Sequence, residues 1–178
     1  MQIGVDTVSY LRIALGLLFV AVGISKCFNR RAFERAVAGF QVVPERLAPV
    51  AAALIVGLEI AGGGMLVLGA QVRLGAFIIA GLLACFSFAL VLNLMRGRRN
   101  LECECYGGRS LRIGWGHVAQ NAALLGIALL IGFTAVFGSP NWLTFLAAAY
   151  TATLFLAAQA LADVRAGLIR ILSRIKTE

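Results

Sequence analysis

The sequence predicts an all-α integral membrane protein, a bundle of about five transmembrane helices with amphipathic helices at the membrane interface. Hydrophobic residues make up 61% of the 178 residues, charged residues only 13%, and the mean hydropathy is +0.91. A soluble domain is about 45–50% apolar and about 25% charged. Apolar segments of about twenty residues, long enough to cross a bilayer, alternate with short polar connections. A chain of this length has room for one bundle, so we expect a single transmembrane domain over residues 1–178.

The five predicted spans cover residues 8–28, 48–69, 74–95, 113–137 and 142–162. The first lacks the basic start and the small-residue cleavage site of a signal peptide, so we expect it to be retained as a membrane helix. The second and third are separated by a very short turn and should form a tight helical hairpin. A Gly-Ser-Pro-Asn turn separates the last two spans.

Two further segments have the pattern of helices that lie along a membrane surface. Residues 30–43 place apolar side chains at helical spacing among arginine and glutamate residues. Pro44 is expected to end this helix, because proline lacks a backbone N–H and clashes with the preceding turn. Residues 163–178 also gather apolar side chains on one face with basic neighbours, which predicts an interfacial extension of the last span.

The positions of the basic residues predict the orientation of the bundle. An excess of 16 Lys and Arg over 8 Asp and Glu would suggest nucleic-acid binding in a soluble protein. Here the basic residues cluster between apolar spans, so we expect the lipid bilayer as their partner and no nucleic acid. Arg12 and Arg73 fall on one side of the predicted bundle, and the other fourteen fall on the opposite side: Lys26, Arg30, Arg31, Arg35, Arg46, Arg96, Arg98, Arg99, Arg109, Arg112, Arg165, Arg170, Arg174 and Lys176. In the inner (plasma) membrane of a cell, the positive-inside rule then places the N-terminus outside, and the C-terminus and the connection between the third and fourth spans in the cytoplasm.

That connection contains two of the four cysteines, Cys103 and Cys105, separated by one residue. They can form a disulfide only if the chain turns sharply enough to bring their Cα atoms within about 4.4–6.8 Å, and Gly107 supplies flexibility next to the pair. A small, strained disulfide of this kind is easily reduced, which is typical of exchanging pairs. Glu104 disfavours a thiolate whereas the nearby arginines favour it. We therefore expect Cys103 and Cys105 to undergo thiol–disulfide exchange.

Two other interpretations of the cysteines remain open. The pair could consist of inert loop thiols in a protein that serves only as an assembly scaffold. Alternatively, Cys103 and Cys105 could join Cys27 and His117, which fall near the same membrane face, as ligands of a soft metal ion in a carrier or chaperone. The spacing of the pair differs from the usual zinc motif, in which two residues separate the cysteines.

Four other residues inside the spans are candidates for a relay or a proton-transfer role: Cys27, Glu59, Cys85 and His117. Glu59 and Cys85 each lie roughly 15–18 Å from a predicted span end, near the middle of the bilayer. An ionisable residue at that depth is a functional candidate, although Glu59 could also be a hydrogen-bonded packing residue and Cys85 a small buried apolar one. His117 shares a helical face with Gln120 and Asn121, which predicts a polar patch that points into the bundle and serves either packing or proton transfer.

The segment from Arg96 to Gly108 resembles the signature of the methylamine utilisation protein MauE family, in which a polar loop after a helix carries a Cys-Gly-Cys-Phe-Gly type sequence. Further similarities over residues 10 to 135 are Ser25-Lys26, Val43-Pro44, Glu59 and the segment from Ile113 to Asn121. The chain departs from the family pattern at Glu104, Tyr106 and Gln120, where the family usually has glycine, phenylalanine and arginine.

This resemblance implies a multi-pass membrane protein that supports maturation of the small subunit of methylamine dehydrogenase, a periplasmic protein rich in disulfides. It also implies a thioredoxin-like partner and a disulfide-containing client protein. A cofactor is identified neither by the residues nor by the resemblance. The implied client is periplasmic whereas the charge pattern predicts a cytoplasmic Cys-x-Cys pair, so direct exchange with the client would require the opposite orientation or a relay.

Overall fold

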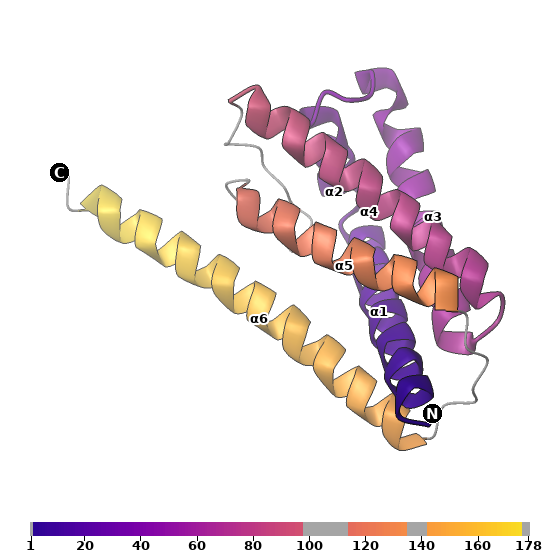
Figure 1. The fold of residues 1–178 in the computed structure, drawn as a ribbon. Coiled ribbons are helices and arrows are strands. Elements are labelled where there is room, and N and C mark those ends of the chain that lie inside the picture. The colour runs from indigo at the N-terminus through magenta and orange to yellow at the C-terminus, as the bar shows by residue number, and fades with distance from the viewer. Residues whose placement is uncertain (1, 98–113, 135–141, 176–178) are drawn as a thin grey trace.

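The computed structural model describes residues 2–97, 114–134 and 142–175, and within these ranges every regular element is a helix (Figure 1). Five of the helices are long and apolar enough to cross a membrane. The predicted all-α fold with about five transmembrane helices is therefore confirmed. In chain order the elements are α1 (Gln2–Phe28), α2 (Arg30–Gly39), the short 3-10 helix η1 (Glu45–Leu47), α3 (Ala48–Leu68), α4 (Val72–Met95), α5 (Trp115–Thr134) and α6 (Trp142–Ile175).

Helix α1 begins at Gln2, ahead of the predicted start at residue 8, and the amphipathic segment after α1 also departs from its expected boundaries. Helix α2 ends at Gly39 rather than at Val43, and Gln41 adopts a left-handed backbone with a φ of 50°. Glycine is a poor helix former, and a proline disfavours helical geometry in the residue before it, so the chain leaves the helix ahead of Pro44. Pro44 instead caps the start of η1, which leads directly into α3.

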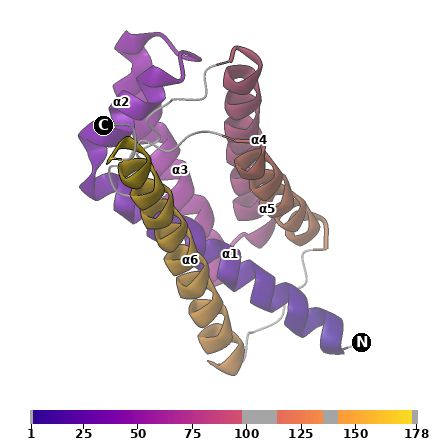
Figure 2. The ribbon, with the colours of Figure 1, turned by 90° about the vertical axis from the view of Figure 1, so that its left-hand side faces the viewer.

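The last helix continues without a break from the fifth predicted span into the predicted interfacial tail. Figures 1 and 2 show α6 as the outermost helix, with its C-terminal end away from the other helices in the view of Figure 1. Its first half packs chiefly on α1, where Ala148 and Ala152 are buried and the Tyr10 hydroxyl donates a hydrogen bond to Thr151 Oγ1 at 2.7 Å.

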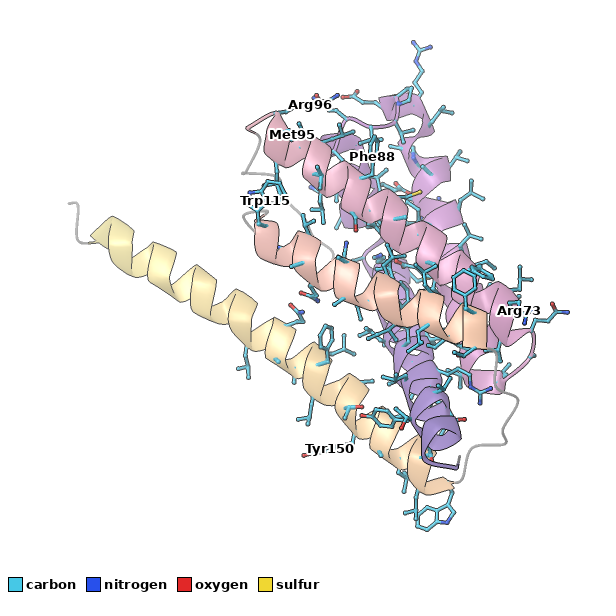
Figure 3. All side chains as sticks on the ribbon, in the orientation of Figure 1. Arg73, Phe88, Met95, Arg96, Trp115 and Tyr150 are labelled. Carbon is cyan, nitrogen blue, oxygen red and sulfur yellow. The ribbon has the colours of Figure 1, made fainter. Side chains whose placement is uncertain are left out.

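The helices run alternately up and down, so that the connections gather at two ends of the bundle. Figure 3 shows Arg96 and Trp115 at the end that also carries α2, and Arg73 at the opposite end. Many large apolar side chains point outward, including Phe88, which is 61% exposed, and Tyr150, which is 65% exposed. An apolar outer surface of this extent is expected for helices that face lipid.

The core is built on close approaches between helices at glycine residues. Helix α1 packs on α3 so closely that a methyl group on Gly16 would lie 2.8 Å from the Gly63 carbonyl oxygen, and one on Gly63 would lie 2.8 Å from the Gly16 carbonyl oxygen. Small residues let the two backbones approach this closely. Close contact stabilises the helix pair because association within lipid depends on van der Waals packing rather than on the hydrophobic effect. Around this crossing, Leu66, Ile79 and Ile131 are fully buried.

Candidate functional site

A cavity of about 310 Å³ lies in the half of the bundle that ends at α2. Its walls are mostly apolar, and they combine residues of each helix from α1 to α6. From α1 come Leu18, Phe19, Val22 and Lys26; from α2 and the turn after it Phe33, Ala36, Val37, Phe40, Val42 and Val43; from α3 Ile55 and Glu59; from α4 Leu82, Leu83, Cys85, Phe86, Ala89 and Leu90; from α5 His117, Gln120, Asn121 and Leu124; and from α6 Gln159.

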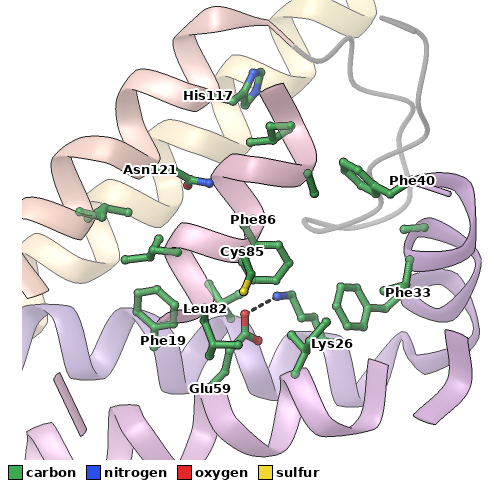
Figure 4. Close-up of a pocket in the computed structure, with 18 of the residues that line it drawn as sticks. Phe19, Lys26, Phe33, Phe40, Glu59, Leu82, Cys85, Phe86, His117 and Asn121 are labelled. Atoms are coloured by element: carbon green, nitrogen blue, oxygen red, sulfur yellow. Dashed lines mark hydrogen bonds and ion pairs between the residues drawn. The ribbon is translucent and has the colours of Figure 1, made fainter. Parts of the chain in front are cut away.

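The polar centre of the cavity is a buried ion pair between Lys26 and Glu59 (Figure 4). The Lys26 ammonium donates a hydrogen bond to Glu59 Oε1 at 2.5 Å, and the two side chains are only 5% and 1% exposed. The same ammonium lies 4.6 Å from the centre of the Phe33 ring and 5.0 Å from that of Phe86. Pairing with a carboxylate and contact with aromatic faces together offset the cost of removing this charge from water.

The pair forms because α1 and α3 do not end at the same level. Lys26 lies in the last turn of α1, whereas Glu59 lies about 16 Å from the start of α3 at 1.5 Å per residue. The start of α3 therefore extends beyond the end of α1. Helix α2 packs beside this extension and closes the space over the pair with Phe33 and Ala36, which are 3% and 5% exposed.

One carboxylate oxygen in the cavity has no hydrogen-bond partner within the described ranges. Glu59 Oε2 is buried and accepts no hydrogen bond from the described residues, although Oε1 is paired with Lys26. A buried polar atom without a partner is costly, and each case in a folded protein needs an explanation. A ligand in the cavity into which Glu59 points would explain this oxygen, because a hydroxyl or amino group of the ligand would donate a hydrogen bond to it.

The α5 wall of the cavity is polar at its outer end. His117, Gln120, Asn121 and Leu124 all line the cavity, in agreement with the helical face predicted from their spacing. His117 is exposed, and its Nδ1 atom accepts a hydrogen bond from the Gly114 backbone N–H at 3.3 Å. Asn121 lies one turn deeper along α5 than His117, toward the ion pair, as Figure 4 shows.

The end of α2 is held in place by Asn93 of α4. The Asn93 amide group donates to the Phe40 carbonyl oxygen at 3.1 Å and to the Ala89 carbonyl oxygen at 2.9 Å. Phe40 also packs in a small apolar cluster of Leu90, Leu94 and Val118. Helices α2, α4 and α5 are thereby fastened to one another at the end of the bundle where the cavity lies.

The structure brings together only some of the predicted site residues. Glu59, Cys85, His117, Gln120 and Asn121 line one cavity. The Cys85 side chain is exposed as well as lining the cavity, so it is not the fully buried apolar residue that was one interpretation of the sequence. Cys27 is exposed and is not among the cavity-lining residues. The predicted exchanging pair and its neighbours lie outside the described residues: Cys103, Glu104, Cys105 and Gly107.

Sequence reasoning missed the partner of Glu59. Lys26 was interpreted as an orientation signal and as part of the Ser25-Lys26 similarity to the family, but not as the partner of a buried carboxylate. The sequence does contain a signal for the pair. A lysine lies in the last turn of one span and a carboxylate lies within the next, antiparallel span, and ionisable residues inside a membrane tend to pair with one another. Phe33, Phe86 and Asn93 were also missed as site residues, since their roles depend on tertiary packing.

The described residues contain no group of three or more His, Cys, Asp or Glu side chains placed to hold a metal ion. In the proposed ligand set of Cys27, His117, Cys103 and Cys105, only Cys27 and His117 fall within the described ranges, and only His117 lines the cavity.

Comparison with known proteins identifies the family. The family model for methylamine utilisation protein MauE matches residues 5–134. The chain is 35% identical to the methylamine utilization protein MauE of Paracoccus denitrificans over 122 residues, which are 68% of this chain and 66% of that protein. It is 30% identical to that of Paracoccus versutus over 67% of this chain and 64% of the relative, and 30% identical to that of Methylorubrum extorquens over 89% of each.

The matched region thus spans just under two thirds of the length of the two Paracoccus relatives. No solved structure shows a significant match to the chain. Because the family model covers well over half of the chain, and because the relatives share at least 30% identity with it, this chain belongs to the MauE family of methylamine utilisation proteins.

Proposed function

We propose that this chain is a membrane thiol–disulfide redox factor that supports maturation of a disulfide-containing client protein, with Cys103 and Cys105 as the exchanging pair. The observation that carries the proposal is the Cys-x-Cys sequence in the polar connection between α4 and α5. Membership of the MauE family ties the chain to methylamine utilisation. The resemblance described above adds the small subunit of methylamine dehydrogenase as the client and a thioredoxin-like protein as the partner.

The helices on either side of the connection support this role. Leu90 and Leu94 of α4 pack with Val118 of α5, so the chain leaves and re-enters the bundle at neighbouring points. The two described ends of the connection that carries the pair therefore lie close together at this end of the bundle. In the exchange, a thiolate of one protein attacks the disulfide of the other, a mixed disulfide forms, and the second thiol resolves it.

The orientation of the pair follows from the basic residues as a further part of the proposal. The described end of the bundle with α2 and Arg96 is also the end where fourteen of the 16 Lys and Arg residues were predicted to gather. The positive-inside rule places this end in the cytoplasm of a cell with an inner (plasma) membrane. A membrane-impermeant maleimide, applied to a variant that retains only Cys103 and Cys105, should label opened vesicles but not intact cells. Labelling of intact cells would reverse the proposed orientation.

The redox proposal is tested by thiol trapping of the purified full-length protein. Equilibration with glutathione buffers over roughly −120 to −270 mV, the range of known exchanging pairs, should change the number of alkylated thiols by two. The change should disappear in Cys103→Ser and in Cys105→Ser, and it should persist in the matched control variants Cys27→Ser and Cys85→Ser. A constant thiol count over the whole range would exclude the redox function.

The same variants separate the two alternative functions. A soft-metal carrier should retain Cu(I) or Zn²⁺ after purification under reducing conditions and lose it on replacement of either loop cysteine. A non-catalytic scaffold should support growth on methylamine equally well with both loop cysteines replaced by serine. Loss of growth with the double variant, without any bound metal, favours thiol–disulfide exchange.

A further inference from the structure

We propose that the cavity around Lys26 and Glu59 binds the head group of an isoprenoid quinone, the lipid-soluble electron acceptor that would reoxidise the Cys103 and Cys105 dithiol. The electron-transfer part of this proposal rests on the proposed redox function. The binding site itself is argued from the described residues alone.

The hydrogen-bonding groups of the cavity match the two redox forms of such a ligand. Glu59 Oε2 is buried and has no partner among the residues that the structure describes, so a quinol hydroxyl can donate a hydrogen bond to it. The Lys26 ammonium has three N–H donors, of which one is used on Glu59 Oε1, so it can donate to a quinone carbonyl oxygen. The ion pair can therefore hold the oxidised ring through Lys26 and the reduced ring through Glu59.

The size and lining of the cavity also fit an aromatic ring with an apolar tail. A volume of about 310 Å³ lies at the small end of the range for small-molecule sites, which are mostly apolar with a few placed polar groups. Phe33 and Phe86 flank the ion pair and offer ring faces and edges for packing (Figure 4). Across the cavity, His117 and Asn121 can bond the second oxygen of the ring.

The cavity has an opening through which a membrane-soluble ligand can enter. Cys85 and His117 both line the cavity, and both are exposed rather than enclosed by neighbouring residues. A quinone can thus place its ring beside the ion pair while its isoprenoid tail leaves toward the lipid. A plain acyl chain would fill the apolar part but would leave Glu59 Oε2 without a donor.

The proposed reaction balances without any further reactant. The two S–H bonds of Cys103 and Cys105 break and one S–S bond forms, which releases two electrons and two protons. The quinone takes up both, its two carbonyl oxygens become hydroxyl groups, and its ring becomes aromatic. The disulfide is then available to oxidise the thioredoxin-like partner.

Photolabelling of the purified full-length protein with an azido-substituted benzoquinone tests the site. Labelled peptides should come from α2, α4 or α5, and an excess of decylubiquinone should suppress the labelling. Ala89 lines the cavity and Ala84 lies exposed on the same helix, so Ala89→Phe fills the site whereas Ala84→Phe is its matched control. We expect labelling to fall about tenfold in Ala89→Phe and to stay unchanged in Ala84→Phe. Equal labelling of the two variants would overturn the assignment.

A second pair of variants tests the hydrogen bond to Glu59. Glu59→Gln should weaken competition by decylubiquinol by about tenfold to a hundredfold, which corresponds to loss of a hydrogen bond to a charged group. Glu34→Gln removes a carboxylate from an exposed ion pair with Arg30 and should leave competition within about twofold of the parent protein. If Glu59→Gln behaves like Glu34→Gln, an apolar chain occupies the cavity and the quinone assignment is wrong.

Replacement of both loop cysteines separates this inference from the proposed function. Cys103→Ser/Cys105→Ser should keep the labelling of the cavity while losing reduction of decylubiquinone by the dithiothreitol-treated protein. Cavity labelling without any quinone reduction by the parent protein would support the site and overturn the redox function. If Cys103 and Cys105 exchange in the thiol-trapping experiment but Ala89→Phe leaves the labelling unchanged, the redox function would be supported and the quinone site would be overturned.

Discussion

The three consecutive glycines of α3 should respond very differently to the same substitution, alanine. Gly62, Gly63 and Gly64 differ in what an added methyl group would meet. At Gly63 it would lie 2.8 Å from the Gly16 carbonyl oxygen, which is backbone and cannot move without shifting α1. At Gly62 it would lie 3.1 Å from side-chain carbons of Ile78 and Ile79, and at Gly64 nothing lies within 4 Å.

These contacts set the order and the size of the effects. Replacing a helical glycine by alanine gains up to about 1 kcal/mol from helix propensity. Inserting a methyl group into a closely packed contact costs about 1–3 kcal/mol, and the cost is at the upper end where the neighbour is backbone. We therefore expect Gly64→Ala to stabilise the bundle slightly, Gly62→Ala to be close to neutral or mildly destabilising, and Gly63→Ala to destabilise it by about 1–2 kcal/mol net.

Thermal denaturation of the purified protein in detergent, followed by the loss of monodisperse protein on size exclusion, measures this order. At roughly 2–4 °C per kcal/mol, Gly63→Ala should denature several degrees below the parent and Gly64→Ala at or above it. The three glycines are adjacent, so the three variants change the same segment at nearly the same depth in the bilayer and serve as controls for one another. Equal midpoints for Gly63→Ala and Gly64→Ala, or a lower midpoint for Gly64→Ala, would refute the α1–α3 packing described above.

Three further predictions concern polar contacts. Glu59→Lys should prevent accumulation of the protein in the membrane, because it leaves the buried Lys26 ammonium without its carboxylate, at a cost of about 3–5 kcal/mol, and places two ammonium groups together; Glu59→Gln should still insert, and both are measured by membrane fractionation. Asn93→Leu should cost about 1–3 kcal/mol and speed amide hydrogen exchange of residues 40–43, because the Phe40 carbonyl oxygen loses its donor. Tyr10→Phe should cost about 0.5–1.5 kcal/mol and raise exchange in α6 around Thr151 while exchange in α4 is unchanged.

The number and the type of the elements could be predicted from sequence because they follow from local properties. An apolar run of about twenty residues has one stable form in lipid, since a helix satisfies every backbone group within the segment. The residue at which α2 ends was predicted less accurately. Pro44 is a strong signal, but the helix already ends at Gly39, and the Phe40 carbonyl oxygen just after it accepts a hydrogen bond from Asn93. That contact comes from a residue of α4, far along the sequence.

Site residues could be predicted together only where they lie on the same face of one helix. The face formed by His117, Gln120 and Asn121 follows from helical spacing and was found in advance. The pairing of Lys26 with Glu59 depends on how far α3 extends beyond the end of α1, which the sequence does not specify. The exposure of Cys85 likewise depends on which face of α4 meets α5.

The placement of the cavity bears on the conflict between the proposed cytoplasmic dithiol and a periplasmic client. Glu59 and Cys85 were considered as a relay across the membrane, but both line the same cavity as His117, in the half of the bundle away from Arg73. In the described part of the chain these candidate residues thus lie between the middle of the bundle and one end, instead of forming a line from face to face. An acceptor in this cavity would serve a dithiol on the same side of the membrane. A client on the other side would then need either a separate carrier of oxidising equivalents or an inverted bundle, in which fourteen basic residues would face outward against the positive-inside rule.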